Sequence, residues 1–212
     1  MKSGFIAVTG KANAGKSTLV NALVGEKVSI VSRKPQTTRD KITGILNGEE
    51  KGERFQAVFI DTPGLHRAEN KLSQYMMREA ESACEGADVV LYLLACDREP
   101  DSHDDERIKA YAALGIPFIL AVSKSDLGGE DAVPRRIERY KSLEGIDAVV
   151  PVCARTGKGL DALKSEIVRF LPEGQPYFDE DVYTDRTMRF MAAEIIREKA
   201  LFELSDELPY GI

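Results

Sequence analysis

Several features that mark secreted, membrane-spanning or zinc-binding proteins are missing from this 212-residue sequence. It has only three cysteines, Cys84, Cys96 and Cys153, an odd number without metal-ligand spacing, so we expect reduced, mostly buried thiols. No apolar run approaches the ~20 residues of a membrane span, and the N-terminus leads into a predicted strand without a secretory signal. These absences predict a cytoplasmic protein.

An excess of positive charge is also missing. The net charge of −6 argues against a free-standing nucleic-acid binder, whose affinity would come from phosphate contacts. Residues 176–212 hold nine acidic and four basic residues, so the rest of the chain is nearly neutral. With 43% hydrophobic residues, the chain suits one globular domain of ordinary size plus an appendage.

The stretch GKANAGKS, residues 10–17, carries the most specific signal. It matches G-x-x-x-x-G-K-[ST] and lies between an apolar run and a helical pattern, the context of a phosphate-binding loop. Gly10 and Gly15 let backbone N–H groups converge on a phosphate, and the helix dipole adds to them. Lys16 supplies charge to the outer phosphates, and Ser17 a hydroxyl to a bridging magnesium ion. An ordinary glycine turn is the competing interpretation, which the flanking strand and helix disfavour. The predicted phosphate-site residues are Gly10, Lys11, Ala12, Asn13, Ala14, Gly15, Lys16, Ser17 and Thr18.

Apolar runs alternate with helical patterns, which predicts an α/β fold with a mostly parallel six-stranded sheet and helices on both faces. Strands are expected at residues 5–8, 41–46, 55–60, 89–95, 118–122 and 148–152. Helices are expected from Ser17 and at 71–84, 104–114, 134–143 and 160–170. The connection 47–54 is too short for a helical crossover, so the second and third strands must form an antiparallel hairpin at a sheet edge.

Further motifs follow predicted strand ends, where ligands of open α/β sheets bind. Asp61-Thr62-Pro63-Gly64 suits magnesium through the Asp61 carboxylate and a terminal phosphate through the Gly64 N–H. The polar segment 32–40 lies opposite the phosphates. There Thr38 is predicted to join Ser17 and Asp61 around magnesium when a third phosphate is present, with Thr37 beside it. Taken alone, each segment is an ordinary turn or a solvated loop.

Two other strand ends predict recognition of a guanine base. Ser123-Lys124-Ser125-Asp126 offers a carboxylate that accepts two hydrogen bonds from the guanine edge, which adenine does not supply. The stem of Lys124 is expected to lie along the base. Cys153-Ala154 presents a backbone N–H toward guanine O6. A helix cap or a strand-end turn is the competing interpretation for each.

This ordered set of motifs resembles the translation-factor-related P-loop NTPases with a Ras-like fold. The sequences PQTTR at 35–39 and DTPGLH at 61–66 narrow the resemblance to the Era family of bacterial ribosome-assembly GTPases. Residues 184–199 and 207–210 are similar to the opening helix of that family's KH domain. The resemblance implies a GTPase domain at 1–174, a linker at 175–183 and, at 184–212, an incomplete start of a KH domain that contributes a C-terminal helix.

The resemblance implies a switch that uses GTP, GDP and Mg²⁺, hydrolyses GTP to GDP and phosphate, and assists small-subunit assembly and 16S rRNA maturation. For the full-length parent it implies the small ribosomal subunit and its rRNA as partners, and peripheral membrane association. RNA binding by residues 1–212 is expected to be absent. A KH domain grips RNA with a G-x-x-G loop, and Gly211 is the only glycine after Gly174.

Three positions depart from the family pattern. Ser123 replaces the usual asparagine, which predicts weaker contacts to the base and to the phosphate loop. Cys153 replaces the usual serine, with less effect because the backbone makes the contact. Leu65 occupies the position of the glutamine that orients water in Ras-like proteins. The predicted catalytic residues are therefore Asn13, Lys16, Thr38 and Gly64.

Several alternatives stay open. In GTPases with this loop pattern an asparagine at position 13 goes with potassium activation, whereas the competing interpretation is that Asn13 only caps the loop. The chain is alternatively a nucleotide-binding module that needs a partner for turnover, or an ATPase or small-molecule kinase, against which Asp126 argues. The helix predicted at 185–204 carries an apolar stripe expected to dock on the GTPase domain or a second molecule, or to fray. The stripe residues are Met188, Met191, Ile195, Ile196 and Phe202.

Overall fold

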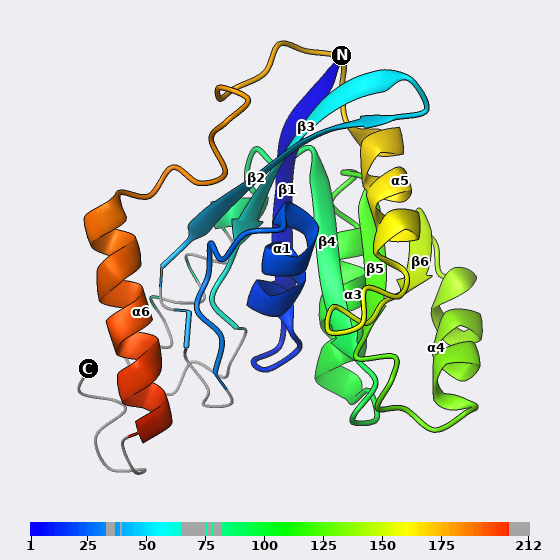
Figure 1. Ribbon diagram of the computed structural model, residues 1–212. Coiled ribbons are helices and arrows are strands. Elements are labelled where there is room, and N and C mark those ends of the chain that lie inside the picture. Colours follow the sequence, from blue (N-terminus) through cyan, green and yellow to red (C-terminus); the bar gives the residue numbers. More distant parts are fainter. Residues whose placement is uncertain (33–36, 39, 65–74, 76–77, 79–81, 204–212) are drawn as a thin grey trace.

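The computed structural model describes residues 1–32, 37–38, 40–64, 75, 78 and 82–203 (Figure 1). Its strands are β1 (Lys2–Gly10), β2 (Ile42–Glu50), β3 (Glu53–Asp61), β4 (Val89–Ala95), β5 (Phe118–Ser123) and β6 (Ala148–Pro151). Its helices are α1 (Lys16–Val24), α3 (Ser102–Ala112), α4 (Ala132–Lys141), α5 (Leu160–Phe170) and α6 (Met188–Glu203). These elements alternate along the chain as the sequence predicts.

The strands form one six-stranded sheet in the order β2-β3-β1-β4-β5-β6. Every neighbouring pair is parallel except β2 and β3, which pair antiparallel at the edge. The predicted hairpin is confirmed, and its strands run further than expected. A two-residue turn, Lys51 at φ 52° and Gly52 at φ 83°, replaces the expected loop because two left-handed residues match the twist of the paired strands.

Apolar side chains cover both faces of the sheet, as expected for strands buried between helices. Every residue of β4 and of β5 is buried. One core cluster joins the sheet to α1 and α5, and a second joins it to α3 and α4. The predicted arrangement of helices on both faces is therefore confirmed.

The segment 175–183 lies along the β2–β3 edge and is held there by hydrogen bonds. The Gln56 side-chain amide donates to Phe178 O at 2.8 Å and accepts from the Tyr177 and Phe178 N–H groups. Further on, Ile45 N–H donates to Tyr183 O at 2.9 Å. These contacts bring α6 beside β2, away from the other helices (Figure 1).

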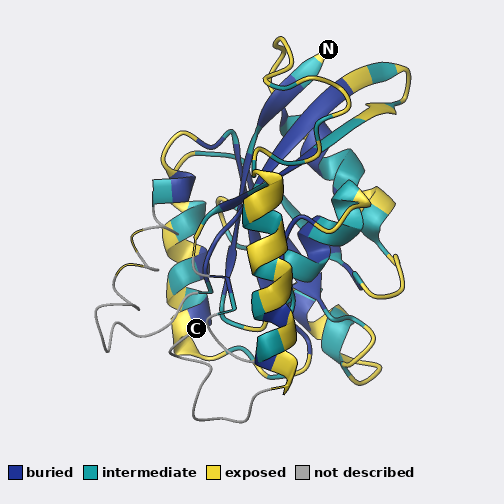
Figure 2. Ribbon diagram, turned by 60° about the vertical axis from the view of Figure 1, so that its left-hand side comes forward, coloured by how far each residue is buried: buried dark blue, intermediate teal, exposed yellow. Residues whose placement is uncertain are grey.

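Helix α6 docks against the chain that follows α1, but through a different face from the one expected. The buried Glu198 carboxylate accepts the Val31 N–H at 2.9 Å and pairs with Lys27, and Arg197 donates to Thr37 O at 2.7 Å. The expected apolar stripe is largely exposed (Figure 2): Met188 is 80% exposed, Ile196 69% and Phe202 62%. Helical spacing located the stripe correctly, but polar partners on the loop after α1 determine which face docks.

Some predictions concern residues outside the described ranges. They include most of the helix expected at 71–84, Leu65, the Pro35, Gln36 and Arg39 positions of the polar loop, and the chain from Leu204 onward. Among the described residues, no helix has the length and apolar character needed to cross a membrane. Cys84, Cys96 and Cys153 are buried, as expected, and form no disulfide among the described residues.

Candidate functional site

The loop between β1 and α1 has the turned backbone that its glycines predict. Gly10 has φ 140°, and a Cβ there would lie 2.6 Å from Leu93 O, while Gly15 has φ 93° and is the N-cap of α1. Asn13 has φ 59°, a left-handed conformation that asparagine tolerates better than most residues. The loop thus turns back over the N-terminus of α1. The left-handed backbone at position 13 is by itself a reason for an asparagine there.

Lys16 is enclosed by this loop. Its ammonium donates to Gly10 O at 3.1 Å and to Lys11 O at 3.2 Å, and the residue is only 6% exposed. Burial lowers the pKa of Lys16 to about 8, and the nearby Asp61 carboxylate opposes that shift. A buried cation with only two carbonyl partners is well suited to the negative charge of a polyphosphate.

Three predicted metal ligands come from three different segments. The hydroxyl groups of Ser17, on α1, and Thr38 lie 3.0 Å apart. The Asp61 carboxylate, at the end of β3, is fully buried, and among the described residues neither of its oxygens has a hydrogen-bond partner. Burial raises the pKa of Asp61, opposed by the charge of Lys16 and by the nearby hydroxyls of Ser17 and Ser29. An unpartnered carboxylate beside hydroxyl oxygens provides the ligand type that Mg²⁺ prefers, so these residues fit the ion.

Gly64 packs directly on the phosphate loop. A Cβ at this position would lie 2.6 Å from Ala12 Cα and 2.9 Å from Ala12 N, so only glycine allows this approach. Thr62 holds the segment in place, because its hydroxyl donates to Val8 O at 2.8 Å. The cavity formed here is lined by the predicted residues Ala12, Asn13, Gly15, Lys16, Ser17, Thr18, Thr37, Thr38 and Gly64, and also by Ile30, Val31 and Ser32, which no motif indicated.

A second cavity adjoins the first, since Gly15 and Thr18 line both. It brings together the predicted base-recognition residues Ser123, Lys124, Asp126, Cys153 and Ala154. Ser123, which stands in place of the usual asparagine, keeps a side-chain contact to the phosphate loop. The Ser123 hydroxyl donates to Ala14 O at 2.7 Å, because the serine is buried directly behind the loop.

Asp126 is held ionised at the mouth of this second cavity. Arg155 donates to Asp126 Oδ2 at 2.7 Å, and the Cys153 thiol donates to Asp126 Oδ1 at 3.1 Å. The hydrogen bond from Arg155 is the main reason that the pKa of Asp126 falls to about 2. Arg155 was not predicted, because no motif marks it beyond its position next to Ala154. At neutral pH the carboxylate is therefore an acceptor for donors such as those of guanine.

Of the two backbone N–H groups at residues 153 and 154, only one is available to a base. Cys153 N–H donates to Lys158 O at 2.8 Å and is occupied, whereas the Ala154 N–H has no protein acceptor among the described residues. Ala154 is thus the available donor for guanine O6, and Cys153 acts through its thiol on Asp126 rather than through its backbone. Lys124 has φ 53°, and its ammonium donates to Asp97 Oδ2 at 2.5 Å, an acceptor that the motifs did not indicate.

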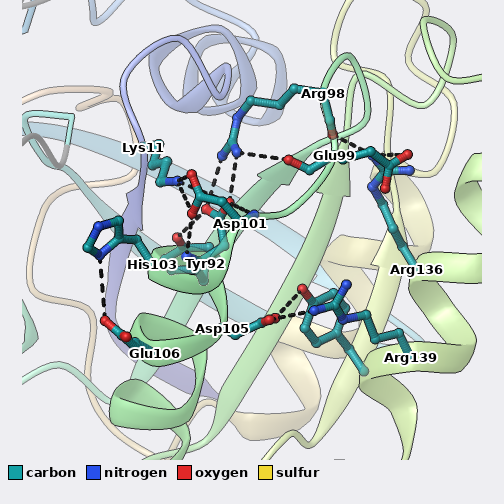
Figure 3. Close-up of polar contacts among 12 residues, drawn as sticks. Lys11, Tyr92, Arg98, Glu99, Asp101, His103, Asp105, Glu106, Arg136 and Arg139 are labelled. Atoms are coloured by element: carbon teal, nitrogen blue, oxygen red, sulfur yellow. Dashed lines mark hydrogen bonds and ion pairs between the residues drawn. The ribbon is translucent and has the colours of Figure 1, made fainter.

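The side chain of Lys11 does not join the phosphate cavity. Its ammonium reaches the start of α3, where Asp101 and Asp104 accept its hydrogen bonds (Figure 3). Lys11 therefore contributes to the loop through its backbone. The other predicted site residues line the two adjoining cavities, except Gly10 and Asp61. Gly10 accepts a hydrogen bond from Lys16, and Asp61 is buried near Lys16 and Ser17.

The fold and the site together define the class of this protein: it is a P-loop GTPase. A sequence model of the family described as "50S ribosome-binding GTPase" matches residues 5–124. The chain belongs to the Era family of these enzymes, as the sequence motifs predicted. GTPase Era of Clostridium botulinum is 41% identical over 211 residues, which cover all of this chain and 70% of that protein.

Solved structures of the family agree. A variant of Aquifex aeolicus Era bound to GDP and aluminium fluoride superposes with a TM-score of 0.89 at 38% identity, over 99% of this chain and 70% of that one. Era in complex with MgGDPNP and nucleotides 1506–1542 of 16S ribosomal RNA has the same TM-score, identity and coverage. The expected family, fold and nucleotide class are thereby confirmed.

Proposed function

We propose that this chain binds GTP with magnesium, hydrolyses it to GDP and phosphate, and acts as a molecular switch. The observation that carries the proposal is Asp126, an ionised acceptor whose cavity adjoins that of the phosphate loop at Gly15 and Thr18. A base that donates two hydrogen bonds, bound there, leaves its phosphates over the N-terminus of α1 and Lys16. Guanine has this donor edge and adenine does not, which argues against an ATPase or a small-molecule kinase.

Each proposed role follows from the position of its residue. Lys16 and the loop N–H groups balance the charge of the phosphates, and Ser17, Thr38 and Asp61 hold Mg²⁺, which supplies further positive charge to the phosphate oxygens. Thr38 belongs to a polar loop, and at this site its hydroxyl contacts that of Ser17. Loss of the third phosphate removes the reason for that position, so the loop around Thr38 is the switching element.

The biological setting is proposed from the relatives. The Era complex with 16S rRNA supports a role in maturation of the small ribosomal subunit, with its rRNA as partner and the cytoplasm as location. We propose residues 1–174 as the GTPase domain, 175–183 as a linker and 184–212 as the start of a KH domain. The hydrogen bonds of Gln56 to residues 177 and 178 support a linker that is fastened to the first domain.

Two measurements test the proposal. Nucleotide extracted from the purified protein and identified by its base should be guanine nucleotide; adenine nucleotide alone would contradict the assignment of Asp126. Phosphate release at single turnover should then show hydrolysis of bound GTP. Tight guanine binding with no release would favour the module that depends on a partner, for which Leu65 in place of a water-orienting glutamine is the argument.

A further inference from the structure

The phosphate loop is fastened at Lys11 to a helix that takes no part in the proposed nucleotide contacts. Lys11 Nζ donates to both carboxylate oxygens of Asp101 at 2.6 Å and to Asp104 Oδ2 at 3.1 Å. The Lys11 side chain is 20% exposed, that of Asp101 54% and that of Asp104 only 1%, so the network is exposed at Asp101 and buried at Asp104. Figure 3 shows Lys11, the residue after β1, reaching across to Asp101, the N-cap of α3.

The two carboxylates are held in place by other groups. Asp101 caps α3 by accepting the Asp104 N–H at 3.0 Å, and Asp104 returns the contact by accepting the Asp101 N–H at 3.0 Å. Arg98 adds two hydrogen bonds to Asp104, at 2.7 and 3.0 Å. Burial raises the pKa of Asp104, but the hydrogen bonds from Arg98, the Asp101 N–H and Lys11 outweigh it, so its pKa lies below the ordinary value. At neutral pH Asp101 and Asp104 are therefore both ionised and accept hydrogen bonds from Lys11.

The backbone of Lys11 connects this network to the phosphate site. Its carbonyl accepts the Ala14 N–H at 3.2 Å, which closes the loop, and the Lys16 ammonium at 3.2 Å. A displacement of Lys11 thus moves both the loop turn and the cation that faces the phosphates. Lys16 has Gly10 O as its other acceptor, one residue earlier on the same segment.

We propose that Asp101 and Asp104 are positioning residues of the nucleotide site: by holding Lys11 they keep the phosphate loop in its binding conformation before nucleotide arrives. The proposal rests on the guanine-nucleotide function proposed above. A preformed loop lowers the ordering cost of binding, and its loss appears mainly as faster ligand release. The competing explanation is that Asp101 serves only as the cap of α3.

The chain allows the two roles to be separated. Asp101→Ser keeps a good N-cap oxygen but removes the charge that Lys11 binds. Lys11→Met removes the anchor from the other side, and Lys11→Arg restores a cation that reaches the carboxylates. The matched control is Arg139→Gln, which breaks an ion pair of the same helix, Asp105 with Arg139, on the side facing α4 (Figure 3).

Two readouts apply to each variant: amide hydrogen exchange of residues 10–16 in the nucleotide-free protein, and the release rate of a fluorescent GDP analogue. Lys11→Met should raise the exchange rate of residues 10–16 and the release rate of the GDP analogue, each on the order of 10-fold. Loss of a residue that orients a binding group has effects of this size. Asp101→Ser should have a smaller effect because Asp104 still accepts from Lys11, and it should add nothing in the Lys11→Met background. Lys11→Arg should lie closer to the wild type than Lys11→Met in both readouts, and Arg139→Gln should match the wild type.

The proposal would be overturned if Lys11→Met had the exchange and release rates of the wild type. Additive effects of Lys11→Met and Asp101→Ser would also overturn it. A drop in melting temperature with unchanged loop exchange would likewise leave Asp101 as a helix cap only. If the wild-type protein binds no GDP analogue, the proposed function fails, while exchange in the nucleotide-free protein still decides whether the anchor holds the loop.

Discussion

Binding of GDP is expected to take up a proton at mildly alkaline pH, and Lys16 is the group that receives it. Burial lowers the pKa of this ammonium from 10.5 to about 8 in the nucleotide-free site. Phosphate oxygens beside it reverse the effect of burial by favouring the charged form, so the pKa rises on binding. At pH 7 roughly 0.1 of the Lys16 side chains are neutral before binding, and at pH 8.5 roughly 0.75.

The sign of the pH dependence follows from this shift. Between the two pKa values the complex holds one proton more than the free protein, so affinity falls as pH rises. From pH 7 to pH 8.5 the association constant for GDP should fall about 4-fold by this effect alone. Below pH 7 Lys16 is charged in both states and its contribution to the pH dependence disappears.

Isothermal titration calorimetry in two buffers of different ionisation enthalpy measures the proton directly. The slope of apparent enthalpy against buffer enthalpy should correspond to uptake of roughly 0.75 proton at pH 8.5 and nearly none at pH 7. Lys124→Met is the control, because it weakens base binding without touching the group that titrates and should keep the uptake. Equal proton numbers at the two pH values, or loss of the uptake in Lys124→Met, would refute the assignment to Lys16.

Three substitutions test other parts of the site. Asp126→Asn should lose GTP by up to ~10⁴ in affinity and gain xanthine nucleotide, measured by competition; unchanged GTP affinity would remove the guanine assignment. Gly64→Ala places a Cβ 2.6 Å from Ala12 Cα and should slow single-turnover hydrolysis on the order of 10²-fold while GDP still binds, whereas Gly129→Ala, with open space around it, should hydrolyse like the wild type. Hydrolysis should be ~10-fold faster in potassium chloride than in sodium chloride. Asn13→Gly keeps the left-handed backbone but removes the side-chain carbonyl, so it should abolish the difference. Equal wild-type rates in the two salts would exclude a potassium role.

The features that the sequence predicted are those built from neighbouring residues. The phosphate loop spans eight positions, and its glycines, lysine and serine act through a backbone turn that they form themselves. β4, at Val89–Ala95, has the predicted bounds because an unbroken apolar run reports burial on both faces. The β2–β3 hairpin followed from chain length alone, since a short connection does not allow a parallel crossover.

Only the tertiary structure decided which distant groups meet. Lys11 binds Asp101, 90 residues away, and Arg155 binds Asp126, 29 residues away, although no motif marks either pair. The docking of α6 shows the same limit: periodicity identifies an apolar stripe, but Glu198 and Arg197 make the contact because the loop after α1 offers N–H and carbonyl partners. Spacing along a chain reports which side chains share a face, whereas the partner of that face depends on how separate elements pack together.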